Sequence, residues 1–281
     1  SLILLLKIKP DLILSFGGYL AVPVVIIGKL LGISCIAHEQ TVVSGYANRL
    51  IAKFADKILY AWPQSQEYLP TEKSIMVGLP LRDSIYKVES DKYEVNASFP
   101  TIYITAGKTG SHIINELILS NLGKLLNEFN IIHQTGDHSV YRDFDKLIAA
   151  YERIKDKVPG KYNLEKFVYE KNIGEAFNKA DFIISRSGAH ICYEVMSLNK
   201  PAVFIPIPWV SHNEQQLNAE KVKDSGLAEI IREEDLERGD FNIFIKNFAA
   251  NLDKYSAGKN INLVKNSAEK IVDEAEKATQ G

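Results

Sequence analysis

Residues 180–194 read ADFIISRSGAHICYE. The first part is a short apolar run that predicts a buried strand, and the Ser-Gly turn after it leads into a helical pattern from Ala189. A strand, a polar turn and a helix in this order form part of a βαβ unit. Such units build a parallel sheet that is covered by helices on both faces.

The same alternation extends in both directions from this segment. Upstream, strands are predicted at 12–16, 33–37, 57–61 and 74–77, with helices at 20–31 and 46–54. Around and after it, strands are predicted at 101–105, 129–133, 166–168, 181–185, 202–206 and 228–231, with helices at 112–127, 140–157, 172–178, 189–197 and 214–224. The pattern predicts an α/β protein with two Rossmann-like domains.

The polar, irregular stretch 88–100 is typical of a linker between these two domains. We predict a first domain over residues 1–95 and a second over 96–257. A Lys- and Glu-rich amphipathic helix is predicted from 262 to 279, and we expect residues 258–281 to pack back on the first domain. The first domain is expected to be incomplete, because a doubly wound fold usually opens with a strand and a Gly-rich turn.

Composition excludes several classes of protein. The 281 residues carry 33 Lys and Arg against 35 Asp and Glu, so a net charge of -2 makes nucleic acid a poor partner. Cys35 and Cys192 form neither a disulfide framework nor a CxxC site, which favours a reduced, cytoplasmic setting. The apolar stretch 12–36 is interrupted by Gly17, Gly18 and Pro23, which favours a strand followed by a helix over a membrane span.

The loop at 105–111, TAGKTGS, joins a predicted strand to a predicted helix. The backbone of Gly107, Lys108 and Gly110, together with the helix start, can hold a phosphate group. The loop lacks the residue order of a Walker motif. The alternative is a tight turn that needs glycine only for its backbone angles.

Two further loops of the second domain follow predicted strands. The loop Arg186-Ser187-Gly188 opens a helix that carries Glu194, which can accept hydrogen bonds from ribose hydroxyls or can be an ordinary acid near a helix start. Gln215 and Asn218 share one helix face and can bind sugar hydroxyls, although surface amides are common.

In the first domain, two neighbouring strands end in polar or glycine-rich turns. His38 and Glu39 follow one strand, and Gly17, Gly18 and Tyr19 follow the other. This group can serve acid-base chemistry or orient an acceptor, although a lone histidine is usually structural. The sequence has no GxSxG nucleophile elbow and no pattern of metal-ligand spacing, so we expect neither a metal nor a cofactor.

Seven segments share a pattern with one family. They are FGGY at 16–19, HEQ at 38–40, NRLIAKFADK at 48–57, LPLR at 79–82, HQTG at 133–136, ADFIISRSGAHICYE at 180–194 and QLNA at 216–219. In this order they resemble the bacterial glycosyltransferase family that adds N-acetylglucosamine to undecaprenyl-diphospho-muramoylpentapeptide and forms lipid II. The resemblance implies a GT-B fold, with two Rossmann-like domains that face each other across a cleft.

The resemblance also implies roles for individual residues. The C-terminal domain would bind UDP-N-acetylglucosamine and the N-terminal domain the lipid acceptor, on the cytoplasmic face of the plasma membrane. Positions implied on the donor side are Glu194 for the ribose, Val168 near the uracil, Ala189, His190 and Ile191 along the diphosphate, Gln215 for the sugar hydroxyls, and Arg82, Lys108 and Asn218. Positions implied on the acceptor side are His38, Glu39, Asn48 and Tyr19.

This sequence departs from the family at several points. Thr41 and Leu79 each replace an Asn, and Gly107-Lys108-Thr109-Gly110 replaces a GGSxG loop. The family's opening Gly-rich loop with its histidine has no counterpart, so we expect the chain to begin after it. We expect an inverting, metal-independent transferase. The alternatives are a transferase or epimerase that acts on another nucleotide sugar, and a donor-binding subunit of a split enzyme.

The first 60 residues carry six Lys or Arg against three acids. Such a basic, apolar end suits docking of a peripheral protein on an anionic membrane surface, although ordinary surface lysines explain the charges almost as well.

Overall fold

The computed structural model describes all residues except 211–212, 237–238, 257–262 and 280–281. The chain forms two compact units. Unit 1 comprises Ser1–Leu81, Val210–Asn218 and Asn262–Gly281, and unit 2 comprises Arg82–Trp209 and Ala219–Ile261. The predicted boundary at 257/258 and the predicted helix start at 262 lie outside the described residues.

Unit 1 is built on a parallel sheet of four strands in the order β1-β2-β3-β4. Its strands are β1 (Leu12–Ser15), β2 (Ser34–Glu39), β3 (Lys57–Tyr60) and β4 (Ser74–Met76). Its helices are α1 (Leu2–Ile8), α2 (Ala21–Leu30), α3 (Tyr46–Phe54) and α11 (Ser267–Thr279), with 3₁₀ turns at Pro63–Tyr68 and Thr71–Lys73.

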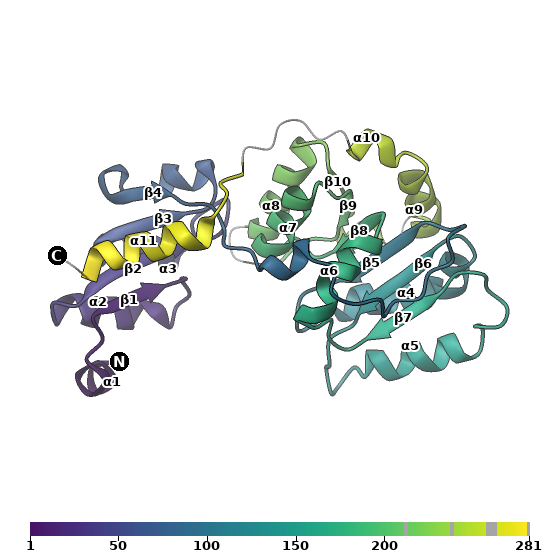
Figure 1. Cartoon of the computed structure of the whole chain (residues 1–281), viewed down its shortest axis with the longest axis horizontal. Helices are drawn as coiled ribbons and strands as arrows, with labels where there is room; N and C mark the ends of the chain where they lie inside the picture. The colour runs from purple at the N-terminus through teal and green to yellow at the C-terminus, as the bar shows by residue number, and fades with distance from the viewer. Residues whose placement is uncertain (211–212, 237–238, 257–262, 280–281) are drawn as a thin grey trace. The chain divides into compact units, whose positions relative to one another are not determined.

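The two faces of this sheet bury different helices. Cys35 and Ala37 pack with the apolar residues of α2 and α3, whereas the intervening Ile36 packs with Ile271 of α11. Successive strand residues point to opposite faces, so α11 covers the face that α2 and α3 leave open. Figure 1 shows α11, drawn in yellow, lying across the strands of unit 1.

Unit 2 is built on a parallel sheet of six strands in the order β10-β9-β8-β5-β6-β7. Its strands are β5 (Thr101–Thr105), β6 (Asn130–Gln134), β7 (Tyr162–Glu165), β8 (Phe182–Ser185), β9 (Ala202–Phe204) and β10 (Ala228–Ile230). Read from β7, this is the order 3-2-1-4-5-6 of a doubly wound Rossmann sheet. Successive strands are added on one side of β5 and then, from β8 onward, on its other side, so the strand order reverses between β5 and β8. Ligands of such sheets bind at this reversal, beyond the carboxyl ends of the strands.

Most helices of unit 2 connect these strands. The connecting helices are α4 (His112–Leu126), α5 (Asp143–Glu152), α6 (Glu170–Lys179) and α7 (Ala189–Leu198), whereas α9 (Phe241–Ala249) and α10 (Leu252–Ser256) follow β10. Unit 2 also has 3₁₀ turns at Asp83–Tyr86 and Glu233–Asp235. Helix α8 (Glu214–Asp224) contains residues of both units. Strand and helix side chains interdigitate in one core that includes Ile102, Ile118, Ile131, Phe182 and Ile245.

One strand prediction is wrong. The strand expected at 166–168 lies at Tyr162–Glu165 instead. There Tyr162 is buried and its hydroxyl bonds to His133 on the neighbouring strand. After this strand the backbone N–H of Val168 donates to the side chain of Gln134 rather than to the sheet. Helices α1, α9 and α10 were not predicted, and α5 is shorter than the expected 140–157.

Within the described residues, none of the helices combines the length and the apolar character that crossing a membrane requires.

Candidate functional site

Two helices of unit 2 begin side by side at the reversal of its sheet. The last residues of β5 and β8, Thr105 and Ser185, are partners in the sheet register. From these ends the chain runs through short loops into α4, which begins at His112, and α7, which begins at Ala189. The first N–H groups of a helix lack intrahelical partners, and a positive partial charge accumulates there. Two such helix ends together favour a diphosphate.

The side chain of Arg186, in the loop after β8, connects this loop to the loop after β5. Its Nε donates to Ser111 Oγ at 3.0 Å, and its Nη1 donates to the Ile205 carbonyl at 2.8 Å. Nη1 also lies 2.6 Å from Oε1 of Glu233. Arg186 is buried, and burial lowers its pKa while Glu233 opposes that shift. The guanidinium, whose charge is paired with Glu233, holds the two loops in position relative to each other.

Glycine is required where the loop after β5 meets the loop after β6. Gly110 has a φ of +71°, and a Cβ there would lie 1.8 Å from the carbonyl oxygen of Thr135. Gly136 has a φ of +75°, and its Cβ would lie 2.3 Å from the carbonyl oxygen of Thr109. Only residues without a side chain allow the two backbones to approach this closely.

Gln134 connects the same loop to the residue expected near the uracil. Its Nε2 donates to the Gly107 carbonyl at 2.8 Å, and its Oε1 accepts from the Val168 N–H at 2.7 Å. Val168 is buried. Gln134 lies in the segment HQTG at 133–136, and its role could not be predicted because its two partners lie on different loops.

Glu194 occupies the sixth position of α7, and its carboxylate is buried. Burial raises its pKa, and Arg82 opposes this shift with an Nη2–Oε1 contact of 3.2 Å. The first turn of α7 carries no acid, so Glu194 lies too far along the helix to be a helix-start acid. A paired, buried carboxylate of this kind can accept hydrogen bonds from two adjacent hydroxyls.

The other predicted donor residues of unit 2 lie around the starts of α4 and α7. Lys108 is exposed, Ser187 is buried, and Gly188 is the residue before α7. His190 is exposed and Ile191 is half-buried. The protein atoms around the His190 ring and the charge of Arg82 lower its pKa, which favours the neutral imidazole.

In unit 1 the structure brings Gly17, Glu39 and Asn48 together. The carboxylate of Glu39 is buried and accepts hydrogen bonds from the N–H and Oγ1 of Thr41, at 3.0 and 2.8 Å, and from Asn48 Nδ2 at 2.9 Å. Gly17 has a φ of +88°, and a Cβ there would lie 2.6 Å from Asn48 Oδ1. The Gly turn and the acid therefore meet through Asn48.

His38 is fully buried beside this group. Its Nε2 lies 2.9 Å from the Gly78 carbonyl, so Nε2 carries the hydrogen, and its ring lies 5.7 Å from that of Phe16. Gly18 and Tyr19 are exposed at the turn after β1.

Gln215 and Asn218 belong to unit 1, whereas Glu194 belongs to unit 2. Asn218 is fully buried, and its Oδ1 accepts from the Val42 N–H at 3.4 Å. Gln215 is half-buried. Burial raises the pKa of the neighbouring Glu214, and the charge of Glu39 raises it further.

Comparison with known proteins identifies the family. Residues 101–275 match the glycosyltransferase family 28 C-terminal domain, and residues 1–60 match the glycosyltransferase family 28 N-terminal domain. The UDP-N-acetylglucosamine–N-acetylmuramyl-(pentapeptide) pyrophosphoryl-undecaprenol N-acetylglucosamine transferase of Clostridium botulinum (strain Kyoto / Type A2) is 31% identical. That alignment covers 94% of this chain and 73% of the relative.

Solved structures show the same architecture. The crystal structure of Acinetobacter baumannii MurG matches with a TM-score of 0.74 and 25% identity, over 98% of this chain and 77% of that one. The UDP-GlcNAc 2-epimerase of Methanocaldococcus jannaschii, solved in complex with UDP-GlcNAc and UDP, matches at 16% identity with a TM-score of 0.63, over 98% of this chain and 78% of that one. That second likeness extends to the fold alone. The chain belongs to glycosyltransferase family 28, is related to MurG, and has a GT-B-like fold of two parallel α/β units.

Proposed function

We propose that this chain transfers N-acetylglucosamine from UDP-N-acetylglucosamine to undecaprenyl-diphospho-muramoylpentapeptide, with inversion at the anomeric carbon. The name of the Clostridium botulinum relative supports this donor and this acceptor. The observation that carries the proposal is the pair of helix starts at His112 and Ala189, together with the buried carboxylate of Glu194 on α7.

The donor occupies the carboxyl edge of the unit 2 sheet in this proposal. The N-terminal ends of α4 and α7 hold its diphosphate, Glu194 its ribose and Val168 its uracil. Arg82 lowers the pKa of Glu194 against the effect of burial and so favours the ionised carboxylate. The remaining donor contacts are proposed for Gly107, Lys108, Gly110, Arg186, Ser187, Gly188, Ala189, His190, Ile191, Gln215 and Asn218.

Transfer proceeds by direct displacement. The acceptor 4-hydroxyl attacks the anomeric carbon, the bond from that carbon to the diphosphate oxygen breaks, and the hydroxyl proton passes to a base. Negative charge grows on the departing UDP, where the two helix N-termini and Lys108 stabilise it. Because these groups supply the positive potential, the step is proposed to need no divalent cation.

The acceptor is proposed to bind unit 1, which would dock as a peripheral protein on an anionic membrane surface at the cytoplasmic face. Gly17, Gly18, Tyr19 and Asn48 would contact it. His38 and Glu39 are the proposed acid-base residues. Thr41 donates twice to Oε1 of Glu39 and Asn48 donates once to Oε2, so Oε2 keeps one acceptor position for an incoming hydroxyl.

The test combines binding and turnover. We expect calorimetry to show UDP-N-acetylglucosamine binding in EDTA, and mass spectrometry to show transfer of the sugar to a short-chain lipid I analogue. Glu194→Gln weakens binding by about tenfold, because ribose hydroxyls lose a charged acceptor. Glu170→Gln, which alters an exposed acid at the start of α6, is the matched control and leaves binding unchanged.

Three outcomes contradict the proposal. Binding that appears only with added Mg²⁺ or Mn²⁺ excludes the metal-independent site. Formation of an epimerised UDP-sugar without acceptor favours an epimerase. Donor binding without transfer to the analogue favours a donor-binding subunit.

A further inference from the structure

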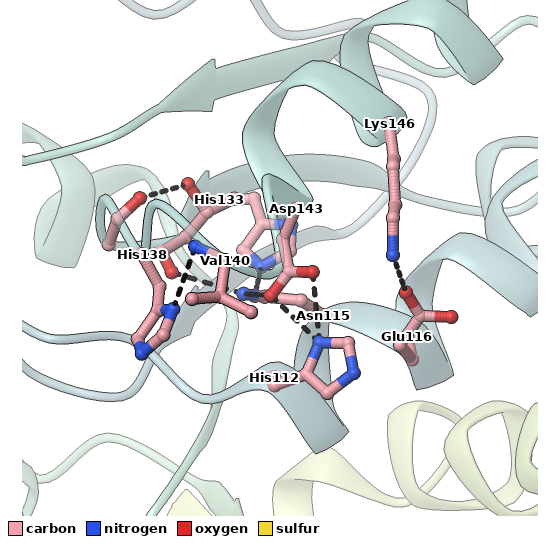
Figure 2. A network of polar contacts seen from close by, with 10 residues as sticks. His112, Asn115, Glu116, His133, His138, Val140, Asp143 and Lys146 are labelled. Carbon is pink, nitrogen blue, oxygen red and sulfur yellow. Dashed lines mark hydrogen bonds and ion pairs between the residues drawn. The ribbon is translucent and has the colours of Figure 1, made fainter.

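Three side chains of metal-ligand type meet between α4 and α5 of unit 2. His112 and Glu116 are four residues apart on α4 and therefore share one face of that helix. Asp143 is the first residue of α5. One potential ligand atom from each residue lies within 4.8 Å of the other two. Figure 2 shows His112 and Asp143 facing each other, with Glu116 one turn further along α4.

Asp143 is held in place by a buried chain of hydrogen bonds. Its Oδ2 accepts from Asn115 Nδ2 at 2.8 Å. Asn115 Oδ1 lies 3.1 Å from His133 Nε2, and His133 Nδ1 lies 2.8 Å from the Tyr162 hydroxyl. An amide oxygen only accepts, so His133 Nε2 carries the hydrogen and Nδ1 accepts from Tyr162. The hydrogen bonds run in one direction and end on the Asp143 carboxylate.

This arrangement has the character of a metal site with an outer layer of hydrogen bonds. In such sites the ligating carboxylates are themselves hydrogen-bonded, which fixes their orientation. Asp143 is only 7% exposed, and Asn115 and His133 are more deeply buried. Asp143 also borders a hollow of about 180 Å³ whose lining includes Arg142, His138 and Lys166. The His112 side chain is 32% exposed, so an ion can reach this ligand from solvent.

We propose that His112, Glu116 and Asp143 bind a divalent transition-metal ion of the zinc class. One imidazole nitrogen and two carboxylate oxygens are ligands that zinc accepts, with water in the fourth position. His112 Nδ1 lies 2.9 and 3.1 Å from the two Asp143 oxygens. Ligand atoms around a tetrahedral zinc ion lie roughly 3.3 Å apart, so this pair needs only a small adjustment.

Glu116 completes the site by rotation of a solvent-accessible side chain. Its carboxylate is 40% exposed and lies 2.9 Å from Lys146 Nζ, which is also exposed. The ammonium group of Lys146 therefore neutralises the Glu116 carboxylate and competes with the metal ion for it. A bound divalent ion displaces this lysine, and Lys146 opposes metal binding.

The bound ion joins the first turn of α4 to the first turn of α5. Because α4 follows the loop 107–110 directly, the ion stabilises the start of this helix as well as unit 2 as a whole. His112 is the first residue of α4, whose backbone N–H groups are proposed to hold the donor diphosphate, but the side chains of His112, Glu116 and Asp143 are not among the proposed donor contacts. Metal binding can therefore be measured without donor, acceptor or turnover.

The test titrates Zn²⁺ into the full chain after chelation and desalting. We expect calorimetry to give one ion per chain and a melting temperature that rises with Zn²⁺, because the ion binds the folded state. His112→Gln and Glu116→Gln each weaken binding by about tenfold or more. Lys146→Met strengthens it several-fold, because the competing ammonium group is lost.

The matched control is His138→Gln. His138 contacts the Tyr141 ring in a tilted arrangement, whereas His112 stacks on that ring, and His138 is not a member of the three-residue cluster. This variant keeps the parent affinity. Co²⁺ provides a direct readout, since its visible absorption in the parent chain disappears in His112→Gln.

The proposal is overturned if Zn²⁺ does not bind the parent chain, or if His112→Gln and Glu116→Gln bind it as the parent does. It is also overturned if His138→Gln loses as much affinity as His112→Gln, which indicates adventitious surface binding only. Glu116→Gln changes an exposed side chain, so it remains decisive even if His112→Gln is unstable.

Discussion

The guanidinium of Arg82 lies 3.2 Å from the buried carboxylate of Glu194, although 112 residues separate them in the sequence. Burial raises the pKa of Glu194, and Arg82 counteracts that shift. The balance between these two effects decides how much of the carboxylate is ionised near neutral pH. A ribose bound at Glu194 depends on that ionised form.

The first prediction concerns the pH dependence of donor binding. Arg82→Met removes the charge that lowers the pKa of Glu194, so the protonated form persists to higher pH. We expect UDP-N-acetylglucosamine affinity to decline as pH falls, and to decline at a higher pH in Arg82→Met than in the parent. The glutamine of Glu194→Gln does not titrate, so this variant lacks the part of the pH dependence that comes from Glu194. Calorimetry at a series of pH values measures it, and superimposable profiles for parent and Glu194→Gln would contradict the role of the carboxylate.

The second prediction compares Gly110→Ala with Gly107→Ala. Both residues have positive φ, at +71° and +70°, so alanine costs each about 1 kcal/mol in backbone strain. Only the Gly110 Cβ would meet an obstacle, the Thr135 carbonyl oxygen at 1.8 Å. Gly110→Ala should therefore lower the free energy of unfolding several times more than Gly107→Ala. Thermal unfolding measures this difference, and equal losses would show that the close approach of the two loops is relaxed in solution.

The local pattern of the sequence predicted most of the fold. Short apolar runs followed by Gly or polar turns located nine of the ten strands in the part of the chain that the structure describes, because most residues of these runs are buried in a parallel sheet. Helix α9 was missed although its signal is present. Asp240 caps it by accepting from two backbone N–H groups, and Phe241, Ile245 and Phe248 recur on one buried face.

The contacts that could not be predicted join residues far apart in the chain. β7 was misplaced because the Tyr162 hydroxyl finds its partner, His133, only in the folded sheet. The bridge formed by Gln134 and the meeting of His112 with Asp143 have the same character. A sequence shows that such residues can form hydrogen bonds, but the packing of neighbouring loops selects their partners.

The third prediction tests how α11 is held against unit 1. Ile271 is 5% exposed and packs on Ile36, Leu59 and Val77, whereas the adjacent Val272 is 53% exposed. Ile271→Ala should cost unit 1 about 2–4 kcal/mol, and Val272→Ala less than about 0.5 kcal/mol.

Denaturant unfolding in a Trp209→Phe background measures this cost, because the buried Trp62 of unit 1 is then the sole tryptophan of the chain. Similar midpoints for Ile271→Ala and Val272→Ala would mean that α11 contributes little to unit 1.

The last prediction concerns His133, whose pKa burial lowers to about 3. Below its ordinary pKa of about 6.5, the unfolded chain binds a proton at this residue and the folded chain does not. His133 therefore contributes stability above pH 6.5 that is progressively lost as pH falls from 6.5 toward 3. The slope from this one group approaches about 1.4 kcal/mol per pH unit within that window.

His133→Gln removes the titration of this residue. The stability of the variant should therefore fall less steeply with decreasing pH than that of the parent, whatever its stability at pH 7. Denaturant unfolding at several pH values gives these slopes, and nitrogen-15 NMR of the imidazole should show a neutral ring with its hydrogen on Nε2 at pH 5. Parallel stability curves for parent and His133→Gln, or a charged ring at pH 5, would mean that His133 can take up a proton in the folded protein despite its hydrogen bonds to Tyr162 and Asn115.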